Sequence, residues 1–194
     1  PERVIAACNG ACASATFIGT HPKTGNLWVY LETIGGGFGA RHNKDGLDGV
    51  HVHLTNTSNL PAEALELEYP LTLLRYELVD GSGGAGTYRG GMGLRRVYRA
   101  EADCRLRIDG SRLHSPPWGL AGGLPGGMGS FAFSEGTEAF SHGQGALKKG
   151  QIVSVITPGA GGYGPPSGRP AAALARDAAE GRNRQAASAA IYGA

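Results

Sequence analysis

The residues best suited to chemistry are gathered between positions 51 and 59 of the chain. His51 and His53 are separated by one residue, and a run of hydroxyl and amide side chains follows from Thr55 to Asn59. If residues 50–54 form a strand, both imidazoles lie on one face and could reach one metal ion together with a third ligand. A polar strand face without a metal is the more common arrangement. The Thr-Asn run either satisfies local backbone groups or contacts a ligand.

Two carboxylates follow on a short predicted helix. Pro61 suits the first position of a helix, and Glu63 and Glu66 then lie one turn apart near its positive end. Adjacent carboxylates repel each other unless an arginine, a metal ion or water lies between them. A solvated acidic turn is the alternative. The candidate arginine partners are Arg41, Arg75 and Arg89.

Arg89 lies in a long glycine-rich loop predicted over residues 80–93. Its guanidinium could hold a carboxylate or phosphoryl oxygen in a two-pronged contact. The alternative is that it pins the loop to a carboxylate, with Glu63, Glu66 and Asp80 as candidates. The sequence alone does not separate these two roles.

Gly35, Gly36 and Gly37 follow an alternating segment directly. Successive glycine amides could form an anion-binding nest. A tight connector without a ligand is the alternative. The Gly-Lys-Ser/Thr ending of a Walker loop is missing, so the chain shows no phosphate-binding fingerprint of its own.

These residues need a scaffold, and the apolar pattern predicts one made mainly of strands. Alternation indicates strands at residues 27–33, 50–54 and 71–79, a hairpin from 94–99 and 104–109, and shorter strands near 131–133, 139–142 and 147–157. Pro70 ends the helix that starts at Pro61. The fold class is therefore α+β, predominantly β, with glycine-rich loops joining the strands, one short central helix and a C-terminal helical tail.

The expected organisation is a β-rich body over residues 1–168 and a helical tail over 169–194. The tail is rich in Ala and Arg, and its helix is expected over 171–190 with a break near Gly181. Its apolar side chains are small, so it is expected to dock through a thin stripe. The bare Pro-Glu-Arg start suggests a separate short subunit, a cleavage product or a fragment.

Composition excludes several classes of function. The 194 residues carry a net charge of +2 and no basic run, which argues against dedicated nucleic-acid binding. No stretch is long and apolar enough to span a membrane, and no signal peptide is evident. The three cysteines, Cys8, Cys12 and Cys104, are an odd number without a CxxC pair and suggest a reducing compartment or free buried thiols, and the expected location is the cytoplasm. Cys8 and Cys12 fit small packing positions better than a nucleophile or ligand pair.

Eight blocks of the chain, in order, resemble the hydantoinase B/5-oxoprolinase family, which includes the large subunits of acetone and acetophenone carboxylases and lactamases of the same kind. The blocks are GGGFGAR (35–41), DGLDGVHVH (45–53), TNTSN (55–59), PAEALE (61–66), YPL (69–71), RYEL (75–78), SGGAGTYRGGMG (82–93) and PGAGGYG (158–164). The resemblance extends along nearly the whole chain, which is similar to the C-terminal third of the family's B subunit.

This resemblance implies a role in a larger complex. An A-type subunit with an actin-like fold would bind ATP and Mg and activate a carbonyl or lactam oxygen. The B subunit would then complete ring opening of a cyclic amide such as a hydantoin, 5-oxoproline or another lactam. The implied partners are this A-type subunit, the front part of the B subunit and a small cyclic amide or ketone substrate. A divalent metal, Zn or Mn, would lie in the front part, so no metal ligand is assigned in this chain.

Within that picture the polar run would line the substrate cavity. Thr55 and Asn56 would orient a carbonyl oxygen as neutral donors, and His53 would shuttle a proton. Substrate-binding roles are expected for Arg41, Asp45, Asn59, Glu63, Glu66 and Arg89, and a cofactor-binding role for Gly35, Gly36 and Gly37. Two alternatives remain within the same resemblance: an ATP-dependent ketone carboxylase subunit, and a non-catalytic scaffold of such a complex. An independent binding domain is a weaker third.

Overall fold

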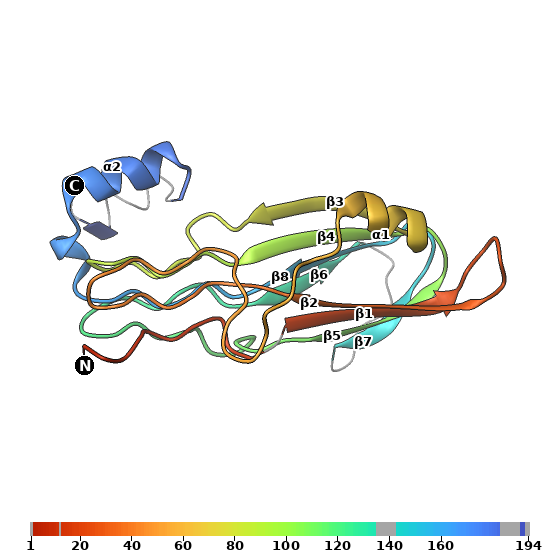
Figure 1. Cartoon of the computed structure of the whole chain (residues 1–194), viewed down its shortest axis with the longest axis horizontal. Helices are drawn as coiled ribbons and strands as arrows, with labels where there is room; N and C mark the ends of the chain where they lie inside the picture. Colours follow the sequence, from red (N-terminus) through yellow and green to blue (C-terminus); the bar gives the residue numbers. More distant parts are fainter. Residues whose placement is uncertain (1, 12, 135–142, 183–190, 193–194) are drawn as a thin grey trace.

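The chain folds as two facing antiparallel sheets in this computed structural model, which describes residues 2–11, 13–134, 143–182 and 191–192 (Figure 1). The first sheet has the order β2-β1-β5-β7 and the second β3-β4-β8-β6. The strands of the first sheet are β1 (Ala13–Thr20), β2 (Leu27–Ile34), β5 (Cys104–Asp109) and β7 (Gln144–Leu147). Those of the second are β3 (Leu71–Leu78), β4 (Leu94–Ala100), β6 (Ser130–Phe133) and β8 (Ile152–Ile156).

Two α-helices complete the described residues, α1 (Ala62–Glu68) and α2 (Ala171–Ala179), with a short 3-10 turn η1 (Pro166–Gly168) before α2. The predicted fold class is confirmed. The strands expected at 27–33, 71–79 and 131–133 are present with their ends shifted by one residue at most. The strand expected over 147–157 is β8, preceded by β7. The strand expected near 139–142 lies outside the described residues.

The core forms where the inward faces of the two sheets meet. Alternate residues of β1, β4 and β5 are buried, and aromatic rings pack across the interface. The Phe17 and Tyr98 rings, from different sheets, have centroids 5.1 Å apart, and both side chains are fully buried. Burying a side chain of this size contributes roughly 1.5–3 kcal/mol to the free energy of unfolding, so these rings hold the sheets together.

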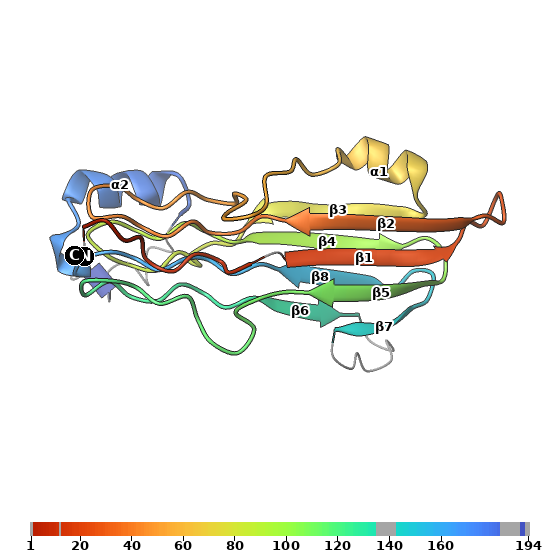
Figure 2. The ribbon, with the colours of Figure 1, turned by 60° about the horizontal axis from the view of Figure 1, so that its bottom comes forward.

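The half of the molecule beyond the strands is built from glycine-rich segments that lie alongside one another (Figure 2). Their backbones are joined directly: Gly37 N–H donates to the Pro158 carbonyl at 3.0 Å, and Ala160 N–H donates to the Gly91 carbonyl at 2.9 Å. A Cβ atom on Gly37 would lie 2.2 Å from the Gly91 carbonyl oxygen. Glycine is needed here because the segments approach closer than any side chain permits.

Residues 50–54 do not form the predicted strand. Only Val50 pairs, in a single bridge to Gly36, and the chain then turns at His53 and Leu54. His53 has a φ of 59°, a left-handed conformation incompatible with a strand, and Thr55 N–H closes the turn on the Val52 carbonyl at 3.3 Å. The expectation that His51 and His53 share one strand face is therefore wrong.

The predicted hairpin of residues 94–99 and 104–109 is also wrong, although both strands exist. β4 pairs with β3 and β8, whereas β5 pairs with β1 and β7 in the other sheet. Ala100 and Cys104 both end in the core, so the short connection between them carries the chain from one sheet to the other. β1 was not expected from the sequence, because its small residues give a weak apolar pattern.

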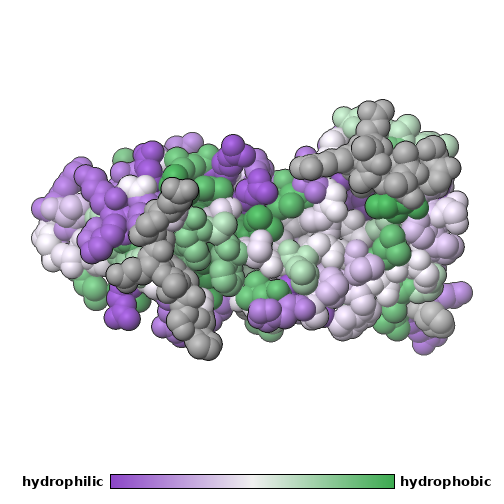
Figure 3. Space-filling view, turned by 180° about the vertical axis from the view of Figure 1, so that it is seen from behind, coloured by the Kyte–Doolittle hydropathy of each residue, from purple (hydrophilic) through white to green (hydrophobic). Residues whose placement is uncertain are grey.

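Helix α2 ends at Ala179, and Gly181, with a φ of 68°, lies just beyond it near the predicted break. Residues 183–190 of the expected tail lie outside the described residues. No helix among the described residues is both long and apolar enough to cross a membrane. On the face seen in Figure 3, hydrophilic residues are densest at the end of the molecule on the left, and apolar residues occur in separate patches between them.

Candidate functional site

An open groove of about 610 Å³ runs along the outer edge of β2. One bank is formed by residues 29–33 of that strand, and the other by residues 57–61 and Tyr69. The second bank is the end of the polar run that precedes α1. The groove therefore combines aliphatic side chains of β2 with hydroxyl and amide groups of the run.

A chain of polar contacts fixes the run against β2. The hydroxyl of Thr57 lies 2.6 Å from that of Thr33 and 3.4 Å from Nε2 of His51. The side-chain amide of Asn59 donates to the Thr33 carbonyl at 2.8 Å, and Tyr76 O–H donates to Asn59 Oδ1 at 2.8 Å. These groups are hydrogen-bond donors and acceptors of the kind that orient a carbonyl substrate.

A buried ion pair supports the C-terminal end of this run. Glu32 is 6 % exposed and accepts hydrogen bonds from Leu60 N–H at 3.1 Å and Tyr98 O–H at 2.9 Å. Nη1 of the fully buried Arg96 lies 2.8 Å from Glu32 Oε1. Burial, reinforced by the charge of Glu32, raises the pKa of the Tyr98 hydroxyl well above its ordinary value. Glu32 thus stays tied to the backbone at Leu60 and fixes the position where the run ends.

The Arg96 guanidinium is held as much by aromatic faces as by hydrogen bonds. It lies 4.4 Å from the centre of the Tyr76 ring and 5.4 Å from that of Tyr98. Its Nε and Nη2 atoms are buried and have no hydrogen-bond partner among the described residues. Cation–π attraction offsets part of this desolvation.

The three residues predicted to be catalytic lie on or next to the turn and are not among the residues that line the groove. His53 and Asn56 are exposed, and Thr55 is half-buried with its hydroxyl donating to the Val52 carbonyl at 3.2 Å. Among the described residues, no three His, Cys, Asp or Glu side chains gather in a group that could hold a metal ion.

The run of Gly35, Gly36 and Gly37 is buried, and the amides of Gly36 and Gly37 are engaged within the protein. Gly36 N–H donates to the Val50 carbonyl and Gly37 N–H to the Pro158 carbonyl, each at 3.0 Å. An anion nest needs free amides that converge on one point. The arrangement is that of the tight connector, so these residues do not fit the phosphates of ATP.

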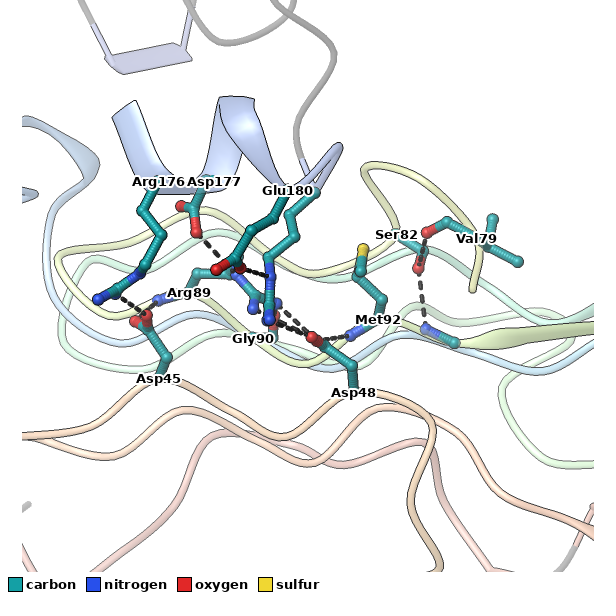
Figure 4. Close-up of polar contacts among 12 residues, drawn as sticks. Asp45, Asp48, Val79, Ser82, Arg89, Gly90, Met92, Arg176, Asp177 and Glu180 are labelled. Carbon is teal, nitrogen blue, oxygen red and sulfur yellow. Dashed lines mark hydrogen bonds and ion pairs between the residues drawn. The ribbon is translucent and has the colours of Figure 1, made fainter. Parts of the chain in front are cut away.

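Asp45 and Arg89 belong to a second, separate cluster that joins the glycine-rich segments to α2 (Figure 4). Arg89 is 2 % exposed, and its Nη1 lies 2.7 Å from Asp48 Oδ1 and its Nε 3.6 Å from Asp177 Oδ1. Arg169, equally buried, donates to Asp45 Oδ1 at 2.8 Å and lies 2.6 Å from Asp177 Oδ2.

These contacts set the ionisation of the cluster. Burial alone would raise the pKa of Asp45, but the hydrogen bonds and charge of Arg169 outweigh it and lower that pKa. The pKa of Arg89 is raised, because Asp48 and Asp177 outweigh its burial. Arg89 therefore has the pinning role considered from the sequence, with Asp48 and Asp177 as its partners in place of Glu63, Glu66 or Asp80.

The remaining predicted residues lie apart from the groove. Arg41 sits at a turn that it closes with Lys44, and its guanidinium lies 5.0 Å from the centre of the Phe38 ring. Glu63 is exposed in the first turn of α1. Glu66 Oε1 accepts from Leu73 N–H at 3.0 Å, which ties α1 to β3. The structure thus gathers His51, Thr57 and Asn59 at one place and Asp45 with Arg89 at another.

Both cysteines within the described residues are buried free thiols, Cys8 and Cys104. Burial raises the pKa of both thiols, that of Cys104 to about 11. Gly39 N–H donates to Cys8 Sγ at 3.3 Å. Such thiols are poor nucleophiles, which agrees with packing positions. Cys12 lies outside the described residues.

The sequence reasoning missed the residues that position the groove and the second cluster. The C-terminal end of the polar run is held by Glu32, Arg96 and Tyr98. Helix α2 is anchored by Arg169 and Asp177. One signal was available for the first group. Glu32 alternates in phase with Trp28 and Tyr30, and a carboxylate on an aromatic strand face requires a buried cation as its partner.

Comparison with known proteins shows a family match, a similar sequence and two similar solved structures. The family model described as hydantoinase B/oxoprolinase matches residues 1–166. The uncharacterized protein MJ0963 of Methanocaldococcus jannaschii is 44% identical over 169 residues, which cover 86% of this chain and 29% of that protein. The crystal structure of ATP-dependent caprolactamase from Pseudomonas jessenii matches with a TM-score of 0.77 at 27% identity, covering all of this chain and 36% of that one.

A nucleotide-free structure of acetone carboxylase, an enzyme of ATP-dependent acetone carboxylation, has the same fold. Its TM-score is 0.73 at 20% identity, and the match covers 97% of this chain and 30% of that one. The chain thus spans about a third of the length of these three relatives.

Proposed function

The chain belongs to the hydantoinase B/oxoprolinase family, and from that premise we propose that it forms the C-terminal part of a B-type subunit in an ATP-dependent cyclic amide hydrolase. In this proposal the B-type subunit completes ring opening of a lactam-type substrate that ATP has activated on an A-type partner. The match to a caprolactamase over the whole chain supports a cyclic amide as the substrate class.

The observation that carries the assignment to this chain is the hydrogen-bonded series Thr33–Thr57–His51 beside the groove. This series ties the polar run to Thr33 on the rigid strand β2, next to an exposed turn that presents further polar groups. Donors fixed before the reaction stabilise the charge that develops on a carbonyl oxygen during ring opening. The turn at His53 is exposed in this chain, and in this proposal the rest of the subunit closes over it the cavity in which the substrate binds.

Within the cavity we assign roles as follows. Asn56 orients the carbonyl oxygen, and His53 gives a proton to the ring nitrogen as the C–N bond breaks. The hydroxyl of Thr55 donates to the Val52 carbonyl, so Thr55 supports the turn and does not donate to the substrate. Asn59, whose amide is committed to Thr33 and Tyr76, positions the run and does not contact substrate. Arg41 is a further candidate for a carboxylate or phosphoryl group. Asp45 and Arg89 act through the fold.

The amides of Gly36 and Gly37 are already bonded to carbonyl oxygens, so the glycine run does not offer them to the phosphates of ATP. In this proposal ATP and Mg bind to the A-type partner. A divalent metal, Zn or Mn, is proposed for the front part of the subunit, as the family resemblance implies.

The test uses the assembled enzyme and measures open-chain product formed per ATP hydrolysed. His53→Ala should reduce kcat by roughly 100-fold or more, as expected for loss of a proton-transfer group, and Asn56→Ala by a comparable factor for loss of a carbonyl donor. His42→Ala is the matched control, since His42 is an exposed histidine on the Arg41–Lys44 turn. Turnover unchanged in both His53→Ala and Asn56→Ala would rule these roles out.

Ketone carboxylation is the second candidate, because acetone carboxylase shares the fold. The two reactions differ in the co-substrate: ring opening adds water, whereas carboxylation adds bicarbonate. ATP hydrolysis that depends on a ketone and bicarbonate, and not on a lactam, would favour the carboxylase. ATP-coupled turnover that is indifferent to every substitution along residues 51–59 would instead indicate a scaffold.

A further inference from the structure

We propose that β2 is the edge on which the remainder of the B-type subunit docks, by adding an extended apolar segment as a further strand beside Val29 and Leu31. The inference rests on the proposed function, since it takes this chain to be one part of a larger subunit. What it adds is the contact surface and the geometry of contact.

The side chains of β2 are arranged with the aliphatic face outward. Leu27, Val29 and Leu31 are 74%, 48% and 62% exposed, whereas Trp28 and Tyr30 are buried. A strand in a complete protein normally turns such residues inward. Three exposed aliphatic side chains in alternate positions form a patch of the kind that marks an interaction site.

One side of the β2 backbone faces β1, and the other side is free. His21 N–H donates to the Asn26 carbonyl at 2.8 Å at the hairpin end, so even-numbered residues of β2 direct their backbone groups toward β1. Odd-numbered residues direct theirs away. The contact of the Asn59 amide with the Thr33 carbonyl, made from the polar run, agrees with this assignment.

Leu27, Val29 and Leu31 therefore present N–H and C=O groups along the outer edge. Among the described residues, none of these groups has a hydrogen-bond partner beyond the β1–β2 ladder. Alternate residues of a strand are about 6.6–6.8 Å apart, which is the spacing that an added strand would match. Main-chain pairing of this kind supplies affinity, and the alternating side chains supply selectivity.

The other sheet edges carry the usual protection against such pairing, and β2 does not. β3 has a register shift between Leu73 and Arg75 and exposes charged side chains. β6 and β7 have four residues each. β2 has eight residues and lacks proline, lysine and any register shift against β1. Natural proteins leave such an edge only where something covers it.

The remainder of the subunit is the partner that fits the β2 edge. The groove runs along residues 29–33, where the added strand would lie. The chain accounts for 29% of the M. jannaschii relative and 36% of the caprolactamase chain, so each has a large remainder that must contact this part somewhere. That remainder would supply the added strand, as an extended segment with aliphatic residues in alternate positions.

Hydrogen exchange measures the predicted pairing directly. The isolated chain is compared with a chimera in which it replaces the matched part of the M. jannaschii relative. The amides of Val29 and Leu31 should exchange rapidly in the isolated chain and on the order of a hundredfold more slowly in the chimera. The amides of Trp28 and Tyr30 should be protected in both. If the chimera does not fold, the same comparison is made with the separately expressed remainder added in trans.

A substitution pair tests whether the edge itself makes the contact. Leu31→Lys places a charge on the edge and should abolish the added protection at Val29. Leu67→Lys is the control, because Leu67 is 85% exposed on α1, away from the edge, and undergoes the same chemical change. Equal protection in both variants would overturn the proposal.

Two further outcomes would also overturn it. One is rapid exchange at Val29 and Leu31 in the folded chimera or with the remainder bound. The other is concentration-dependent protection in the isolated chain, which would make a second copy the occupant. Ring opening does not enter these measurements. A protected edge in an inactive enzyme would leave the docking intact and contradict the proposed function, and an active enzyme with an unprotected edge would do the reverse.

Discussion

The side-chain amide of Asn59 donates a hydrogen bond of 2.8 Å to the backbone carbonyl of Thr33. This contact places the polar run at the outer edge of β2. There it occupies the outward-facing carbonyl nearest the C-terminal end of that strand. The same Asn59 side chain accepts from Tyr76 on β3, so one residue links the edges of the two sheets. The position of the candidate site therefore depends on Asn59.

Replacing Asn59 by Ala should loosen the polar run. Two hydrogen bonds are lost, each contributing about 0.5–1.5 kcal/mol, so the free energy of unfolding should fall by roughly 1–3 kcal/mol. Chemical denaturation gives this value, and hydrogen exchange at Leu60 reports the local change. Ser58→Ala is the control on the same run, and an Asn59→Ala protein as stable as this control would contradict the assigned role.

Removing the Arg169 side chain should detach α2. Asp177 is 1% exposed and would remain as a buried carboxylate without its closest partner. Breaking a buried pair in this way costs about 3–5 kcal/mol. We expect Arg169→Ala to lower the free energy of unfolding by that amount. Arg107→Ala, which breaks an exposed pair with Asp109, should leave stability almost unchanged. Equal effects would show that the cluster does not anchor the helix.

The contribution of Asp45 should depend on pH. Its pKa is lowered in the folded chain by Arg169 and lies below the unfolded value of about 3.9. The unfolded state therefore binds the proton first as pH falls, so the stabilisation is complete above that pH and is lost as pH drops through the folded pKa. The stability difference between wild type and Asp45→Asn should be largest at pH 7 and smaller at pH 3. A difference independent of pH would refute this account.

A methyl group added at Gly37 should disrupt the glycine-rich half. Its Cβ would lie 2.2 Å from the Gly91 carbonyl oxygen and 2.6 Å from Ala160 N, so two backbones must separate. We expect Gly37→Ala to cost about 1–3 kcal/mol or more, or to abolish the soluble yield. Gly110→Ala is the matched control, because the nearest atom to its Cβ is Leu113 Cδ2 at 3.9 Å. Similar yields and stabilities would contradict the close packing.

The sequence predicted β2 as an alternating strand but not which of its faces is buried. Both faces are rich in apolar residues, with Leu27, Val29 and Leu31 on one and Trp28 and Tyr30 on the other. The choice depends on Arg96, which is 64 positions beyond Glu32 in the chain and neutralises it in the core. A local pattern carries no information about such a distant partner.

The same limit explains Arg89. The sequence offered carboxylates close to it in the chain, such as Asp80, whereas its partners Asp48 and Asp177 are brought together by the return of α2. The prediction of a strand at residues 50–54, where the chain turns at His53, failed for a different reason. Val50, Val52 and Leu54 alternate as in a strand, but the pairing of Gly36 with Val50 ends there, and no neighbouring strand within the described residues continues it.

The central claim is that this chain takes part in ATP-coupled ring opening, and it is tested most directly by an omission experiment on the assembled enzyme. Lactams, hydantoins and 5-oxoproline are each incubated with ATP, and open-chain product and ADP are measured with the chain present, omitted and added back. We predict that at least one cyclic amide is opened in step with ATP hydrolysis only when the chain is present, and that adding the chain back restores the rate. Ring opening at the same rate without the chain would contradict the account.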